Sequence, residues 1–178
     1  MTSGPRHSIT LLIVLCLSCA ALAEPGDKQV ASAISDFGIP VLALSVTARA
    51  LGDSGSRDKV LPAGIQSLLT TGGTTLLLKA VVREKRPDGH GHDSFPSGHT
   101  SMAFAMAGVL AQQRGFGGAA WYVPAAAIGW SRVRLRRHRF VDVLAGAAIG
   151  YGFSELAVHD HQPRRGNGPA VMLLQRRW

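Results

Sequence analysis

The chain has 178 residues, of which 46% are hydrophobic and 17% charged, with 21 Gly and 9 Pro. This length favours a single domain, and the apolar fraction excludes a disordered or collagen-like chain. The 19 Lys and Arg residues against 11 Asp and Glu give a formal net charge of +8, which favours an anionic partner without choosing among nucleic acid, a phosphate ester and an acidic lipid surface.

Residues 1–23 have the pattern of a secretory signal peptide. Arg6 precedes a compact apolar run over residues 9–17, and Ala21-Leu22-Ala23 is a small-x-small cleavage site. The run is shorter than the roughly 20 residues that a bilayer span needs. We therefore expect export and cleavage, with an uncleaved anchor or a lipoprotein modified at Cys19 as alternatives. Cleavage removes both cysteines of the chain and leaves no disulfide, thiol nucleophile or cysteine metal ligand.

The rest of the chain is predicted to be helical throughout. No run shows the strict alternation of a strand, so we expect an all-α fold, a compact bundle of five or six helices. A first helix is expected over residues 30–51, bent or interrupted near Gly38 and Pro40. A loop follows over residues 52–56.

A second helix begins with Pro62 in its first turn and ends near Arg86, because Pro87 disfavours helix at the residue before it. Gly72 and Gly73 fall inside it, and we expect close packing or a break there. Helical spacing predicts a buried stripe on this helix. The stripe consists of Ile65, Leu68, Leu69, Leu76 and Ala80.

Three further helices follow a polar loop over residues 88–96. They are predicted over residues 98–113, 121–130 and 139–158, with a basic connection over residues 131–137 between the last two. The inward residues of the first of them are Ala103, Met106, Ala107 and Leu110. In the last helix, Gly146 and Gly150 have the small-xxx-small spacing of closely packed helices, in lipid or in a soluble bundle.

Lys79 and Arg86 form the first of three motifs that suggest chemistry, Lys-x6-Arg-Pro. Seven residues are about two helical turns, so both cations lie on one face of the predicted helix. An ammonium and a guanidinium fork on one face suit a tetrahedral oxyanion such as phosphate. A solvated basic helix end is the alternative for this motif taken alone.

The second motif is Pro96-Ser97-Gly98-His99 at the start of a helix. Ser97 caps the helix, and Gly98 lets an anion approach its free N–H groups. His99 is placed to protonate a leaving oxygen. Taken alone, the motif also fits an ordinary capped helix with an exposed histidine.

The third motif is Ser131-Arg132, with His138 and Asp142 following it. His138 and Asp142 are four residues apart, so a helix places them on one face, where the carboxylate fixes the imidazole tautomer. Arg132 is expected in the connecting loop, folding back over the same anion. A surface His–Asp pair is the alternative for this motif taken alone.

Together the three motifs occur without substitution, in order, over residues 79–142. The pattern is Lys-x6-Arg-Pro, then Pro-Ser-Gly-His, then Ser-Arg-x5-His-x3-Asp. On these residues the chain resembles the type 2 phosphatidic acid phosphatase (PAP2) superfamily, which also includes bacterial acid phosphatases and vanadium haloperoxidases. The helical pattern around the motifs agrees with the helical bundle of that superfamily.

The resemblance implies a metal-independent phosphatase, with no cofactor, that acts through a phosphohistidine. His138 attacks phosphorus, Asp142 orients His138, and His99 protonates the departing alcohol and then helps to activate water. The remaining site residues hold the phosphoryl oxygens. They are Lys79, Arg86, Ser97, Gly98 and Arg132.

Two other kinds of site compete with this interpretation. The loop residues His90, His92 and Asp93 lie close to His99 in the sequence, and a His-x-His pair can chelate a metal. The arginines of residues 132–139 form a basic run of the kind that binds nucleic acid, but no aromatic residues are interleaved for base stacking and the signal peptide predicts export. We therefore expect no metal and no nucleic-acid partner.

The substrate is open within phosphate monoesters and diphosphates, with lipid phosphates and polyprenyl diphosphates ahead of soluble esters. A vanadium-dependent haloperoxidase and a non-specific acid phosphatase are the alternatives. Residues 61–78 contain four Thr and three Gly, which is unfavourable for a bilayer span. We therefore expect a periplasmic enzyme, soluble or attached to the membrane surface, with its phosphatase domain over residues 24–158 and a polar tail over residues 159–178.

Overall fold

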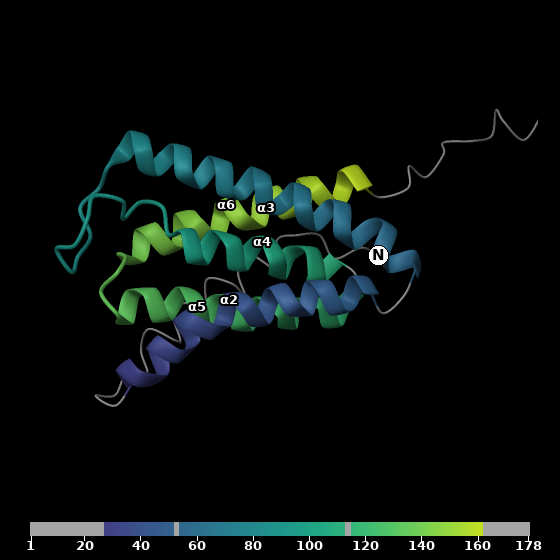
Figure 1. Ribbon diagram of the computed structural model, residues 1–178, viewed down its shortest axis with the longest axis horizontal. Coiled ribbons are helices and arrows are strands. Elements are labelled where there is room, and N and C mark those ends of the chain that lie inside the picture. Colours follow the sequence, from purple (N-terminus) through teal and green to yellow (C-terminus); the bar gives the residue numbers. More distant parts are fainter. Residues whose placement is uncertain (1–26, 52–53, 113–114, 162–178) are drawn as a thin grey trace, which may run out of the picture.

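The computed structural model describes residues 27–51, 54–112 and 115–161, and the structural statements below concern these residues. They form five α-helices and one 3₁₀ helix, and no strand occurs among them, so the predicted all-α bundle is confirmed (Figure 1). The predicted signal peptide and the tail beyond residue 161 lie outside the described residues. The elements in chain order are α2 (Asp27–Leu51), α3 (Ser54–Val82), α4 (Gly98–Gln112), η1 (Gly115–Trp121), α5 (Tyr122–Arg134) and α6 (Phe140–His161).

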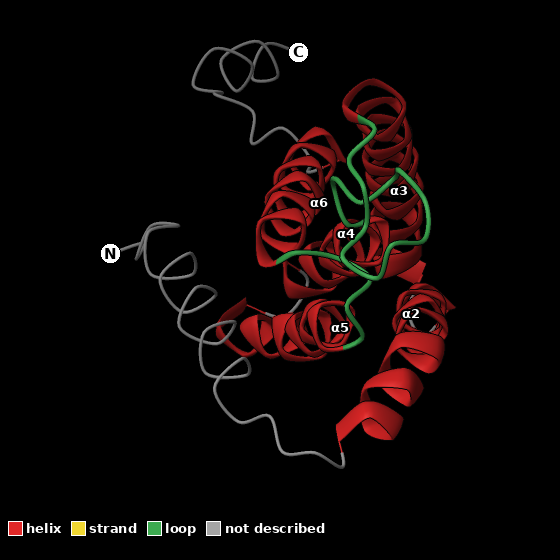
Figure 2. Ribbon diagram, turned by 90° about the vertical axis from the view of Figure 1, so that its left-hand side faces the viewer, coloured by secondary structure: helices red, strands yellow, loops and turns green. Residues whose placement is uncertain are grey.

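Helix α4 is the centre of the bundle. It packs against α2, α3, α5 and α6, and Figure 2 shows it enclosed by them. The predicted inward residues are all buried, but so is the whole segment Ala103–Leu110. A helix that is covered on every side is apolar on every side, so a single inward stripe was too narrow a prediction for this element.

Helices α4 and α6 approach closely at two glycines of α6. A Cβ atom added at Gly146 would lie 2.6 Å from the backbone oxygen of Ser97, and one added at Gly150 would lie 2.1 Å from that of Ser101. Any side chain at these positions would collide with the backbone of α4. The close packing predicted from the small-xxx-small spacing is confirmed, and it holds α6 against the first turn of α4.

Helix α3 has the predicted period but the opposite orientation. Ile65, Leu69 and Leu76, which were predicted to be buried, are 57%, 71% and 69% exposed. Ala80 is also exposed, and Leu68 is half-buried. The buried face instead carries small and hydroxyl-bearing residues. They are Ala63, Gly64, Ser67, Thr71 and Thr75.

The predicted ends of two helices were wrong. Ser54–Ser56, placed in a loop, are helical, so Pro62 lies inside α3 rather than in its first turn, and α3 ends at Val82, before Arg86. Helix α5 continues through the predicted basic connection as far as Arg134. Helix α2 is one element with Pro40 inside it. Burial of a helix against its neighbours overrides the local preferences that suggested these boundaries.

Three helical segments are long and apolar enough to cross a membrane. They are Lys28–Leu51, Asp58–Val82 and Phe140–His161. The second contains the threonines that counted against a span in the sequence. Thr71 and Thr75 face the interior of the bundle, so they do not reduce the apolar character of the outer surface of α3.

Candidate active site

The three motifs meet at one end of the bundle, where the loop of residues 83–97 crosses the start of α4 (Figure 2). Lys79 is in the last turn of α3, and Gly98 and His99 are in the first turn of α4. Arg132 is in the last turn of α5, not in a loop as predicted. His138 lies in the turn before α6, and Asp142 is in the first turn of α6. Residues that are far apart in the sequence therefore lie at the same end of the bundle.

His138 is buried and held in one tautomer. Its Nδ1 lies 2.7 Å from the backbone oxygen of Ser94. A carbonyl oxygen only accepts, so Nδ1 carries the hydrogen and Nε2 keeps its lone pair. Burial lowers the pKa of His138 to about 4, although the bond to Ser94 acts in the opposite direction. At neutral pH this side chain is an uncharged imidazole, the form that a nucleophile requires.

Asp142 reaches His138 through Ser94. Its Oδ2 accepts the Ser94 hydroxyl at 2.5 Å and the Arg139 backbone N–H at 2.8 Å, whereas it lies 3.8 Å from His138 Nδ1. The one helical face predicted for His138 and Asp142 is not formed, because α6 begins after His138. Ser94 is a site residue that the sequence analysis missed, and it lies outside all three motifs.

The cations of the first motif are paired with Asp93. Arg86 Nε and Nη2 donate to its two carboxylate oxygens at 2.8 and 2.7 Å, and Lys79 Nζ donates to its backbone oxygen. The bond from Arg86 is the main reason that the pKa of Asp93 lies below its usual value. Asp93, considered in the sequence as a metal ligand, is therefore an ion-pair partner. Among the described residues, no three His, Cys, Asp or Glu side chains gather as metal ligands.

The first turn of α4 is tied to α6. Ser97 is fully buried, its N–H donates to the Asp142 backbone oxygen at 2.9 Å, and its Oγ accepts the Thr100 hydroxyl at 2.9 Å. A Cβ added at Gly98 would lie 3.8 Å from Lys79 Cε. The backbone here is therefore next to a cation, as an anion site at a helix start requires.

His99 shares its electrostatic surroundings with His138. Partial burial is the largest cause of its lowered pKa, followed by Arg132 and Arg86, with Lys79 acting in the same direction. The same three cations also lower the pKa of His138. Two imidazoles that respond to the same cations lie in one positively charged environment. This is the arrangement that phosphoryl transfer needs, because fixed cations stabilise the charge on the transferred oxygens.

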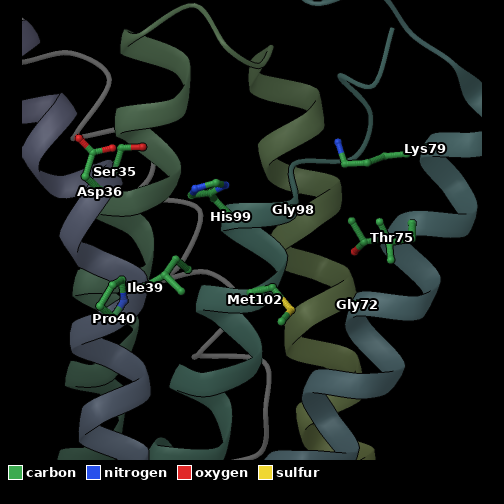
Figure 3. A pocket seen from close by; sticks show the side chains of 11 residues that line it. Ser35, Asp36, Ile39, Pro40, Gly72, Thr75, Lys79, Gly98, His99 and Met102 are labelled. Atoms are coloured by element: carbon green, nitrogen blue, oxygen red, sulfur yellow. The ribbon is translucent and has the colours of Figure 1, made fainter. Parts of the chain in front are cut away.

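A cavity of about 600 Å³ opens beside these residues. Figure 3 shows Lys79 and Thr75 of α3 on one side, Ser35 and Asp36 of α2 on the other, and His99 between them. Lys79, Gly98 and His99 are the predicted site residues in its wall. Much of the remaining wall is apolar and comes from Ile39, Pro40, Leu76 and Met102. The cavity therefore joins a polar, cationic end to an apolar channel between helices.

Known proteins resemble this chain in sequence and in fold. The family model of the PAP2 superfamily matches residues 64–165. A lipid A 1-phosphatase from Porphyromonas gingivalis is 37% identical over 109 residues, which are 59% of this chain and 24% of the relative. The chain thus spans about a quarter of the length of that curated relative. The crystal structure of Aquifex aeolicus LpxE has the same fold, with a TM-score of 0.64 and 23% identity over 83% of this chain and 94% of that one.

Proposed function

Because the chain belongs to the PAP2 superfamily, we propose that it is a phosphatase that hydrolyses lipid-linked phosphate esters through a phosphohistidine on His138. The observation that carries the proposal is the state of His138. Its imidazole is buried and uncharged, and Nδ1–H is donated to Ser94, so Nε2 carries the lone pair. Lys79, Arg86 and Arg132 are close enough to His138 to lower its pKa, which supports a cationic surrounding for the phosphoryl group.

The reaction proceeds in two displacements. In the first, His138 Nε2 forms a bond to phosphorus as the bond to the ester oxygen breaks, and His99 gives its proton to the departing alkoxide. In the second, His99 takes a proton from water, and the hydroxide replaces His138 on phosphorus. Lys79, Arg86, Arg132 and the Gly98 N–H hold the phosphoryl oxygens in both steps and supply the charge stabilisation without a metal ion.

A lipid substrate is supported by the apolar part of the cavity wall and by the three long apolar helices. When a phosphoryl group occupies the cationic end, the part of the cavity beside Ile39, Pro40 and Met102 is still available for the hydrocarbon of the lipid. The P. gingivalis relative is a lipid A 1-phosphatase, and this makes a phosphorylated glycolipid the first candidate. We propose a membrane-associated enzyme, with the site on the periplasmic side as the predicted signal peptide suggests.

The test is a substrate panel with the purified full chain in detergent. Phosphate release is measured from lipid A, diacylglycerol phosphate, a polyprenyl diphosphate and a soluble aryl phosphate, before and after treatment with EDTA. We expect release from at least one lipid, unchanged by EDTA and abolished in His138→Ala. His159→Ala, at an exposed position near the end of α6, is the matched control and keeps full activity.

Two results would contradict the proposal. Release that survives in His138→Ala would place the chemistry elsewhere or in a contaminant. Oxidation of bromide by peroxide with added vanadate, without phosphate release from any ester, would identify a haloperoxidase instead.

A further inference from the structure

Arg132 is anchored by a residue outside the three motifs. Its side chain is buried, with 8% of the residue exposed, and Nη1 donates to Ser35 Oγ at 2.5 Å. Ser35 lies on α2, is 4% exposed, and precedes the segment matched by the family model. The bond joins residues 97 positions apart in the chain, so it depends on how α2 packs against α5.

The packing of α2 on α5 brings Ser35 to this position. Gly38 lies almost one turn after Ser35, and a Cβ added there would be 2.6 Å from Ile128 Cγ1. Ile128 in turn lies about one turn before Arg132 on α5. The two helices therefore make consecutive contacts along facing sides, first Gly38 with Ile128 and then Ser35 with Arg132. Close approach at Gly38 brings the Ser35 hydroxyl within reach of the guanidinium.

A second donor of the guanidinium, Nε–H, is available for a ligand. Arg132 Nε is buried and, among the described residues, has no hydrogen-bond partner. A buried donor without an acceptor costs free energy, and a phosphoryl oxygen is an acceptor of the right charge. The planar fork means that fixing Nη1 on Ser35 also fixes the direction of Nε.

We infer that Ser35 is a positioning residue, which holds Nη1 of Arg132 so that the remaining N–H groups of the guanidinium point to the phosphoryl group. This inference rests on the proposed function. Ser35 does not take part in bond making. It removes the freedom of a long side chain before substrate arrives, so that less conformational entropy is lost on binding.

The test compares Ser35→Ala and Ser35→Thr with the wild type in two measurements, kcat and KM for the best substrate of the panel, and the binding of orthovanadate. We expect Ser35→Ala to lower kcat/KM by about 10- to 100-fold and to weaken orthovanadate binding, because the guanidinium is misplaced. Ser35→Thr keeps a hydroxyl and recovers most of both. Ser45→Ala, farther along the same helix and outside the cavity wall, is the matched control and changes neither.

A double variant separates positioning from folding. In the Arg132→Ala background, Ser35→Ala should lower kcat/KM by less than about 2-fold, because its only target is gone. The inference is overturned if the two losses multiply, or if Ser35→Ala equals the wild type in both measurements. If Ser35→Ala does not fold, the test uses Ser35→Thr instead. Low activity of Ser35→Thr together with a normal melting temperature would then overturn the inference. If the wild type binds orthovanadate more tightly than Ser35→Ala does but releases no phosphate from any ester, the proposed function is wrong and the role of Ser35 stands.

Discussion

The tautomer of His138 depends on one carbonyl oxygen. The backbone of Ser94 accepts Nδ1–H, and the Ser94 hydroxyl is itself held by Asp142. The carboxylate therefore acts on the nucleophile through the loop that precedes α4, not by direct contact. The carboxylate oxygen itself lies farther away, 3.8 Å from Nδ1, so the orientation of the imidazole is set through Ser94.

The Ser94 hydroxyl is expected to matter although it touches no substrate. Ser94→Ala keeps the carbonyl but releases the loop from Asp142, so His138 loses its alignment, and kcat should fall by on the order of 10²-fold. KM and orthovanadate binding should change little, because the cations are untouched. Steady-state kinetics checks this, with Ser45→Ala on α2 as the control. A loss confined to KM would show that the hydroxyl serves binding rather than alignment.

The pH dependence of kcat/KM should follow the two histidines in opposite directions. His138 works uncharged, so it is competent above its pKa of about 4. His99 works as an acid, so it is competent below a pKa that partial burial and the cations hold under 6.5. In the free enzyme the optimum of kcat/KM should therefore lie on the acid side, between these two pKa values.

The His99→Gln variant tests whether His99 causes the fall of kcat/KM at high pH. The second ionisation of a phosphate monoester lies near pH 6 and affects both enzymes equally. The ratio of wild-type to variant kcat/KM should fall as the pH rises through the pKa of His99. A ratio that is constant from pH 5 to 8 would remove His99 from the role of acid.

At the scale of the elements, α3 shows what periodicity does and does not predict. The helical repeat of its apolar residues is real, and it predicted the helix. Which face is buried depends on whether the surroundings are water or lipid, and the spacing of Leu69 and Leu76 is the same in both. The motif residues were predictable because each one carries its chemistry in its type and order. Ser35 and Ser94 were not, because their role arises only where separate segments meet.

The contact of α4 with α6 leads to a stability prediction. Gly146→Ala places a methyl group against the backbone of Ser97, so it should destabilise the fold by about 1–3 kcal/mol. It should also lower activity, since Ser97 precedes the turn of α4 that is proposed to bind the phosphoryl group. Gly152→Ala on the same helix has open space around the added methyl group and should be neutral or slightly stabilising. Melting temperatures and kcat/KM in detergent check both. Equal effects of the two variants would contradict the close packing.

At the scale of the molecule, the long helices turn apolar side chains outward. Examples are Phe37 and Leu44 on α2, Leu69 and Leu77 on α3, and Leu156 on α6. The small and hydroxyl-bearing residues of α3 face inward, where they allow close approach to α4 and α6. Apolar surface of this extent on the outside of a bundle marks a face that contacts a membrane or another protein.

We therefore expect the full chain to stay in the membrane pellet after extraction with alkaline carbonate and to require detergent for release. Immunoblotting of the fractions, with a soluble periplasmic protein as the marker of complete washing, checks this. Recovery of active enzyme in the carbonate supernatant would instead support the surface attachment that the sequence suggested.

The hydrogen bond from the Ser97 N–H to the Asp142 carbonyl joins the start of α4 to the start of α6. Neither turn can open without breaking it, so the two belong to one cooperative unit of local unfolding. Their amide protons should exchange with deuterated solvent at matching slow rates, although the two turns are far apart in the chain. A substitution that loosens the first turn of α4 should therefore also speed amide exchange in the first turn of α6, and the reverse.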